Sequence, residues 1–152
     1  YRGAAPINWA IINGEKQTGV TTFLLQHEID TGNILLQEGF AIEETDDAGS
    51  IHDKMKKIGA AVLLKTVKAI ASGTLKAKPQ LTDNNRALQH APKIFTETCL
   101  INFNKPVNEV FNLIRSLSPY PAAFTILNNK NLKIFKAAII NTQQKIPARQ
   151  WQ

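Results

Sequence analysis

Residues 18–42, TGVTTFLLQHEIDTGNILLQEGFAI, contain two runs rich in β-branched and large apolar residues, separated by a short polar segment. The runs at 18–26 and 34–42 have the composition of strands. The intervening Asp30–Thr31–Gly32 has the composition of a turn, in which Asp bonds the local backbone and Gly32 supplies a positive φ. This stretch therefore predicts two consecutive strands joined by a turn.

Helical patterns lie on both sides of this predicted strand pair. Residues 4–13 have apolar side chains at helical spacing and end at an Asn-Gly stop signal. A longer helix is expected over residues 51–72, N-capped by Ser50 and terminated by Gly73. Its apolar positions form one stripe that we expect to face a core: Ile51, Met55, Ile58, Val62, Val67 and Ile70.

The rest of the chain indicates a second structural part. Residues 74–92 are rich in Pro, Asn and Asp with little periodicity, which is typical of a linker. After it we expect a helix whose first residue is Pro106, and then strands at 123–127 and 132–140 joined by a turn at 128–131. The fold class is therefore α/β, in two parts at 1–73 and 93–152.

Charge divides the chain in the same place. Residues 1–75 carry seven Lys and Arg against nine Asp and Glu, whereas residues 76–152 carry eleven against three. A net charge of −2 followed by +8 suggests that the second part faces a polyanion, although a solvated basic face is the plainer alternative. The single Cys99 excludes an internal disulfide and is expected to be a buried apolar residue in a reducing compartment. No apolar run reaches the roughly 18 residues of a membrane span.

The charged turn offers little chemistry when taken alone. His27, Glu28 and Asp30 lack the spacing of a metal site, so no metal is expected. A carboxylate at a strand's exit can orient a catalytic histidine, but neither His52 nor His90 has a recognisable context for that role. Near the N-terminus, Arg2 and Gly3 form either a tight loop that leads into a helix whose N-terminus holds an anionic or polar group, or an ordinary loop–helix junction.

Five ordered blocks carry a resemblance to a known family. They are YRGAAPINWAIINGEKQTGVT (1–21), HEIDTGNIL (27–35), SIHDKMKKIGAAVLLKTVKAI (50–70), APKIFTE (91–97) and IRSLSPYPAAFT (114–125). Together these blocks resemble methionyl-tRNA formyltransferases. The first two blocks are shared with other folate-dependent formyltransferases, including those acting on amino-sugars, whereas the APKI block and the basic second part favour the tRNA enzyme.

The resemblance implies a reaction and an architecture. Members transfer a formyl group from 10-formyltetrahydrofolate to the methionine amino group of initiator methionyl-tRNA, in translation initiation. The first part would be the C-terminal portion of a Rossmann-like catalytic domain, and the second a portion of an OB-like barrel that helps to bind tRNA. A cytoplasmic, bacterial and monomeric protein is implied. The alternatives are a formyltransferase with a non-tRNA acceptor and a non-enzymatic RNA-binding module.

The resemblance also assigns residues. The family's catalytic aspartate lies in its DTG loop and matches Asp30, whereas His27 does not match its catalytic histidine. Loops at the substrate and folate pocket would include Arg2, Gly3, Ile29, Thr31 and Gly32. Charge makes Lys130, Lys133, Lys136 and Arg115 candidates for tRNA contacts. The family's catalytic Asn and His precede the segment that matches Tyr1, so we expect this chain to be part of a longer protein and to be inactive alone.

Overall fold

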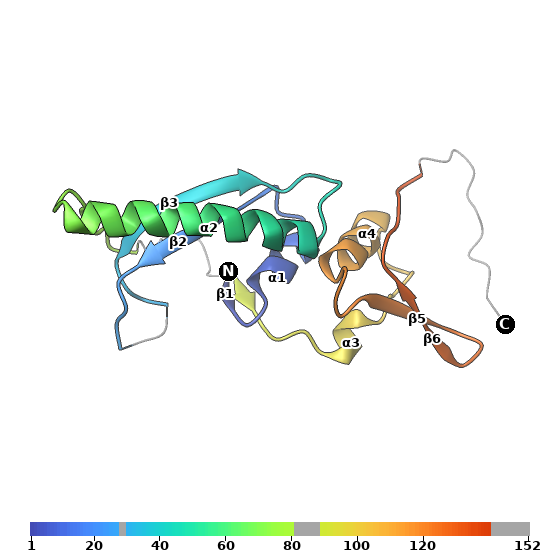
Figure 1. Cartoon of the computed structure of the whole chain (residues 1–152). Helices are drawn as coiled ribbons and strands as arrows, with labels where there is room; N and C mark the ends of the chain where they lie inside the picture. Colours follow the sequence, from blue (N-terminus) through green and yellow to red (C-terminus); the bar gives the residue numbers. More distant parts are fainter. Residues whose placement is uncertain (28–29, 81–88, 141–152) are drawn as a thin grey trace.

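The computed structural model describes residues 1–27, 30–80 and 89–140 of the 152-residue chain. Strands and helices are interspersed along it, and α2 is the longest element (Figure 1). The strands are β1 (Arg2–Gly3), β2 (Gln17–Phe23), β3 (Ile34–Ala41), β4 (His90–Ala91), β5 (Ala123–Leu127) and β6 (Lys130–Ile134). The helices are α1 (Pro6–Ile12), α2 (Ala48–Ala71), α3 (Thr96–Cys99) and α4 (Val107–Ser116). The strands pair two by two, so the described residues contain three two-stranded sheets.

The strand pair predicted within residues 18–42 is present as the antiparallel hairpin β2–β3. The pairing runs from Gln17 opposite Ala41 to Phe23 opposite Ile34. The prediction extended the first strand to residue 26, but β2 ends at Phe23. The register shifts between Thr22 and Phe23, and such an irregularity bends a strand and interrupts its ladder. The residues after Phe23 therefore leave the sheet and lead into the Asp30 turn.

Helix α2 begins earlier than predicted because its cap is Asp47, not Ser50. The Asp47 carboxylate accepts a hydrogen bond from the Ser50 backbone nitrogen (2.7 Å), and the Ser50 hydroxyl accepts one from the Asp47 nitrogen (3.0 Å). This reciprocal pair is a capping box in which serine takes the third helical position. The expected end is confirmed: α2 stops at Ala71, and Gly73 follows with a φ of 68°.

Only part of the predicted apolar stripe on α2 faces a core. Ile51 and Val62 are buried, at 1% and 2% exposure, whereas Val67 and Ile70 are more than half exposed. Figure 1 shows that the last turns of α2 extend past the hairpin on which the rest of the helix lies. Thr66 is the last buried residue of α2, and its hydroxyl oxygen lies 2.8 Å from that of Thr22 on β2. Periodicity identified the face correctly but could not show where its partner ends.

Helix α1, predicted at 4–13, lies between α2 and α4 and contacts both (Figure 1). It contributes Ala10 and Ile11 to the first hydrophobic core, in which they pack with Ile42, Ala48 and Ile51. Ile11 is completely buried. Helix α1 therefore joins the hairpin and α2 on one side to the second half of the chain on the other. In the part of the chain that the structure describes, no helix is both long and apolar enough to cross a membrane.

The expected linker, 74–92, is attached to the first part at both of its described ends. Lys78 forms an antiparallel bridge with Ile34, with nitrogen–oxygen distances of 2.7 and 2.8 Å. His90 and Ala91 form β4, which pairs in parallel with β1. The residues between these anchors, 81–88, lie outside the described ranges. Composition predicted irregular structure here, but main-chain pairing with distant strands is not visible in composition.

The second part contains α3, α4 and the hairpin β5–β6 around a separate core. Its buried residues are Cys99, Ile101, Ile114, Leu117 and Ala123. Cys99 is buried as predicted, and burial raises the pKa of its thiol. Pro106 was expected as the first residue of its helix, but it takes the preceding N-cap position of α4. The fixed φ of proline suits either place at a helix start.

The second hairpin is tighter than predicted. Strand β5 has the expected bounds, whereas β6 covers 130–134 instead of 132–140. Asn128 and Asn129 both have positive φ, 50° and 58°, and Leu127 pairs directly with Lys130. This is the geometry of a two-residue hairpin turn, whose twist matches that of the strands. The turn therefore takes two residues instead of four, and β6 starts two residues earlier.

Candidate functional site

The Asp30 turn contains a residue with positive φ, but that residue is Asp30 and not Gly32 as expected. Asp30 has a φ of 59°, in the left-handed region that Asp tolerates better than most residues. Gly32, which was expected to supply a positive φ, is required instead by close packing. A Cβ at this position would lie 1.5 Å from the carbonyl oxygen of Leu24. The turn therefore favours Asp at position 30 because of its backbone angle, and it requires Gly at position 32 because there is no space for a Cβ.

The side chain of Gln80, which the sequence did not predict as part of this site, supports the turn by hydrogen bonds to its backbone. The amide nitrogen of Gln80 donates to the carbonyl oxygen of Asp30 (3.0 Å) and to that of Gly32 (2.7 Å). The guanidinium of Arg2 donates in turn to the amide oxygen of Gln80. Three distant segments, at residues 2, 30–32 and 80, thus meet through a single glutamine. A glutamine beside Pro79 in a segment of low periodicity gives no sequence signal for this contact.

Arg2 and Gly3 are held by main-chain pairing. Arg2 pairs with His90 and Gly3 with Ala91 in the β1–β4 sheet. Gly3 has a φ of 139°, and a Cβ there would lie 2.2 Å from the Ala91 carbonyl oxygen, so no other residue fits. The backbone that carries the Arg2 guanidinium toward Gln80 is therefore fixed in position.

The remaining predicted residues of this site lie around the turn. Thr31 is half-buried between Asp30 and Gly32, and Ile29 lies outside the described residues. His27 is exposed ahead of the turn. Within the described ranges, no group of three or more His, Cys, Asp or Glu side chains could hold a metal ion. The structure thus connects Arg2 to Asp30 and Gly32 through Gln80, with Gly3 next to Arg2 and Thr31 within the turn. Asp30 is half-buried, and its carboxyl group can orient or exchange a proton with a neighbouring polar group.

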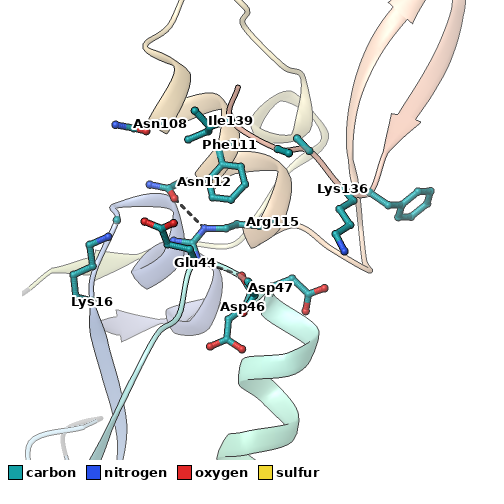
Figure 2. Close-up of a pocket in the computed structure, with 15 residues that line it drawn as sticks. Lys16, Glu44, Asp46, Asp47, Asn108, Phe111, Asn112, Arg115, Lys136 and Ile139 are labelled. Atoms are coloured by element: carbon teal, nitrogen blue, oxygen red, sulfur yellow. Dashed lines mark hydrogen bonds between the residues drawn. The ribbon is translucent and has the colours of Figure 1, made fainter. Parts of the chain in front are cut away.

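Arg115, predicted as an RNA contact, has a structural position instead. It is 8% exposed, on the inner side of α4 (Figure 2). One of its guanidinium nitrogens, Nη1, donates to the carbonyl oxygens of Glu43 (3.0 Å) and Asp46 (3.1 Å), and its Nε donates to the Asn112 side chain. Burial lowers the pKa of the guanidinium, while the charges of Asp46 and Glu44 raise it. Counting charges identified Arg115 as a cation, but it could not show that Arg115 is buried and bonded to main-chain carbonyl oxygens.

The loop that accepts these hydrogen bonds is itself ordered by a buried carboxylate. The Asp46 side chain is bound by Lys54, with nitrogen–oxygen distances of 2.6 and 2.8 Å, and by the Ser50 hydroxyl at 2.9 Å. Burial raises the pKa of Asp46. The hydrogen bonds from Lys54, the Glu43 backbone and Ser50 lower it, and the resulting pKa lies below the ordinary value. Asp46 therefore presents its carboxylate to α2 and its carbonyl to α4.

A cavity of about 650 Å³ adjoins Arg115 between this loop, α4 and residues 135–139 (Figure 2). Lysines and acidic residues both line it, including Lys16, Lys136, Glu44 and Asp47. Its mixed charge does not select one class of ligand.

The three candidate lysines of the second part are all exposed. Lys130 and Lys133 belong to β6, and Lys136 follows it. Because side chains alternate along a strand, Lys130 and Lys133 project from opposite faces of the hairpin. Lys133 pairs with Phe124 across the sheet, and Lys136 lies at the rim of the cavity in Figure 2. The structure therefore spreads these cations around the hairpin and does not gather them on one face.

Comparison with known proteins identifies the class. The formyl transferase family model matches residues 1–67, and the model of the formyl transferase C-terminal domain matches residues 93–149. The methionyl-tRNA formyltransferase of Azobacteroides pseudotrichonymphae is 53% identical over 146 residues, covering 95% of this chain and 45% of that protein. That of Caldanaerobacter subterraneus is 46% identical over 140 residues, covering 92% and 44%. These matches show that the chain belongs to the formyl transferase family and is similar over most of its length to methionyl-tRNA formyltransferases.

Solved structures of related enzymes have the same fold. An N-formyltransferase from Helicobacter canadensis, in complex with folinic acid and dTDP-3-aminofucose, is 26% identical with a TM-score of 0.77. A sugar 3N-formyl transferase, WlaRD, is 28% identical with a TM-score of 0.76. The chain is covered to 93% in both comparisons, and those chains to 51% and 50%. The chain thus spans about half the length of these structures and less than half the length of the two curated relatives.

Proposed function

We propose that the protein to which these residues belong transfers the formyl group of 10-formyltetrahydrofolate to the methionine amino group of initiator methionyl-tRNA, in translation initiation. The observation that carries the proposal is the continuous similarity to methionyl-tRNA formyltransferases, 53% over 146 residues, through both family domains. The folate donor has independent support, because the Helicobacter canadensis relative was solved with folinic acid. The relatives named above are bacterial, which supports a cytoplasmic bacterial protein, and we propose that it acts as a monomer.

The reaction requires little more than positioned proton carriers and an oxyanion site. The amino nitrogen attacks the formyl carbon, a C–N bond forms, and a tetrahedral intermediate carries negative charge on oxygen. As the intermediate collapses, the bond to the folate nitrogen breaks, the amine loses a proton and the folate nitrogen gains one. Asp30 has the residue type and half-buried setting of a carboxylate that holds an imidazole in its charged form. We assign that role to Asp30, and pocket-lining roles to Arg2, Gly3, Ile29, Thr31 and Gly32.

The proposed architecture has two domains. Residues 1–73 belong to a Rossmann-like catalytic domain, residues 74–92 connect it, and residues 93–152 belong to an OB-like barrel that contacts tRNA. The ends of the family matches, at residues 67 and 93, support these boundaries. The net charge of +8 over residues 76–152 supports a polyanionic partner. Lys130, Lys133 and Lys136 are the proposed phosphate contacts, and Arg115 is removed from that set.

A second candidate is formylation of an amino-sugar, since WlaRD is a sugar 3N-formyl transferase and the Helicobacter canadensis enzyme was solved with dTDP-3-aminofucose. Their identities of 26–28% are far below the 46–53% of the tRNA enzymes, so this candidate is the weaker one.

The test supplies the intact protein with 10-formyltetrahydrofolate and two acceptors, initiator methionyl-tRNA and a dTDP-linked amino-sugar. We expect formylation of the aminoacyl-tRNA alone. Formylation of the amino-sugar alone would instead support the second candidate. Salt-dependent tRNA binding without transfer to either acceptor would support the RNA-binding alternative.

A further inference from the structure

Gln80 is connected to the Asp30 turn in a way that fixes the turn's direction. Its amide nitrogen bonds the carbonyl oxygens of Asp30 and Gly32, the two residues on either side of Thr31. With both carbonyls held, the Asp30–Thr31 and Gly32–Asn33 peptide units cannot rotate independently. The backbone that carries the Asp30 carboxylate is therefore set by a side chain 50 residues further along the chain.

The orientation of this amide is determined by Arg2. A guanidinium has only donors, and a carbonyl oxygen has only acceptor sites. The Gln80 oxygen must therefore face Arg2, and its NH₂ group must face the turn. No other side chain of this length both accepts from a guanidinium and donates to two carbonyls: glutamate lacks the donors and methionine lacks both. Arg2 thus selects the one amide orientation that supports the turn.

Both partners are anchored within two residues of the contact. The Arg2 backbone nitrogen donates to the Gln89 carbonyl oxygen at 2.9 Å, within the β1–β4 pairing. Two residues before Gln80, Lys78 forms its antiparallel bridge with Ile34, the first residue of β3. The Gln80 side chain therefore spans a short gap between two fixed pieces of main chain, and its amide is placed with little freedom.

We propose that Gln80 is a positioning residue for Asp30, and that Arg2 acts through Gln80 by orienting its amide. This assignment rests on the proposed function of the Asp30 site. Displacing a catalytic group by about 1 Å can lower a rate by about 100-fold. We expect Gln80→Met to lower kcat for formyl transfer by about 10- to 100-fold in the intact protein, with little change in KM for the tRNA, because the proposed phosphate contacts at Lys130, Lys133 and Lys136 are unchanged.

The experiment measures kcat, KM and the melting temperature for the intact wild-type protein and for Gln80→Met, Arg2→Met and the double variant. Because Arg2 acts through Gln80, the double variant should be no slower than Gln80→Met alone. Gln37→Met is the matched control: Gln37 is exposed on β3 and should leave kcat at the wild-type value. Asp30→Asn provides the reference for complete loss of the site.

The outcomes separate this assignment from the function on which it rests. If wild type is active, Asp30→Asn is inactive and Gln80→Met has wild-type kcat, the assignment is overturned and the function stands. A lowered melting temperature with unchanged kcat also overturns it, because it makes Gln80 structural only. Effects of Arg2→Met and Gln80→Met that multiply in the double variant overturn the role of Arg2. A wild-type protein that transfers formyl to no acceptor overturns both proposals.

Discussion

Asp30 and Arg115 are charged residues that the fold holds in opposite ways. At Asp30 the supporting hydrogen bonds end on the carbonyl oxygens of residues 30 and 32 and leave the carboxyl group out of the support. At Arg115 the hydrogen bonds end on the charged group itself, which lies within bonding distance of two carbonyl oxygens and an amide. The bonds from Gln80 order the backbone of the turn and do not involve the Asp30 carboxylate. At Arg115 the charged group itself joins two parts of the chain.

The largest effect that distinguishes Asp30 from Arg115 is expected when the Asp30 charge is removed. In the intact protein, Asp30→Asn should lower kcat for formyl transfer by about 10³-fold or more, as expected for a carboxylate that holds a catalytic imidazole. The melting temperature should hardly change, because the supporting bonds go to the backbone. Asp53→Asn, on the exposed surface of α2, is the matched control. Wild-type turnover in Asp30→Asn would show that the charge is not used.

The next largest effect is expected at Arg115, and it should appear in stability. Arg115→Met removes the guanidinium donor from both carbonyl oxygens, which leaves that of Glu43 with the Asp46 nitrogen alone and takes from that of Asp46 its bond to α4. We expect the free energy of unfolding to fall by about 2–4 kcal/mol, from the loss of several charge-assisted hydrogen bonds. Lys136→Met, which removes an exposed cation at the rim of the same cavity, should change it by less than about 0.5 kcal/mol. Denaturant titrations of both variants compare the two, and equal losses would contradict the structural role of Arg115.

A smaller, pH-dependent effect should come from Asp46. Its pKa is lowered in the folded state, so the unfolded state binds more protons as the pH falls. The stabilisation is therefore complete above the ordinary Asp pKa of about 3.9 and is lost as the pH falls through the lower folded value. Asp46→Asn should be about 1–2 kcal/mol less stable than wild type at pH 7, and the difference should shrink below pH 4. A difference that stays constant from pH 7 to pH 3 would exclude this linkage.

The smallest effects are expected from the exposed lysines. Lys130→Gln, Lys133→Gln and Lys136→Gln should each weaken tRNA binding only a few-fold. Each true phosphate contact that is lost should reduce the slope of log affinity against log salt by about 0.7–0.9. Binding titrations at several salt concentrations measure the slope, and Arg115→Met serves as the comparison, with an unchanged slope. A reduced slope in Arg115→Met would place that buried cation at the RNA after all.

Sequence patterns predicted the elements that depend on neighbouring residues. Runs rich in β-branched and large apolar residues located β2 and β3, and helical spacing located α2 and α4, with errors of a few residues at their ends. Serine suits an N-cap, so the sequence predicts a cap at Ser50, whereas the reciprocal bonds with Asp47 are a property of the folded turn. Val67 and Ile70 continued the apolar stripe in sequence but lie beyond the surface that α2 covers.

Contacts across long sequence separations were not predictable in the same way. Composition predicted the turn at Asp30, and the resemblance of whole blocks assigned Asp30 its role, but the support of the turn by Gln80 spans 50 residues and leaves no periodic trace. Arg115 was counted as a surface cation because charge alone does not distinguish an exposed guanidinium from a buried one. Both cases depend on where the main-chain carbonyl groups of another segment lie, which composition does not encode.

The side-chain hydrogen bonds that join the two halves of the chain determine which of their residues can be substituted. Arg115 binds the carbonyls of Glu43 and Asp46, Asn8 binds that of Ser116, and Trp9 binds that of Pro92. Every residue offers the same carbonyl oxygen whatever its side chain. Positions 43, 92 and 116 can therefore be substituted without removing an acceptor, whereas these bonds are lost when the donors Asn8, Trp9 and Arg115 are replaced. Hybrids that exchange the segment after residue 92 between family members should keep their joint wherever these three donors are present.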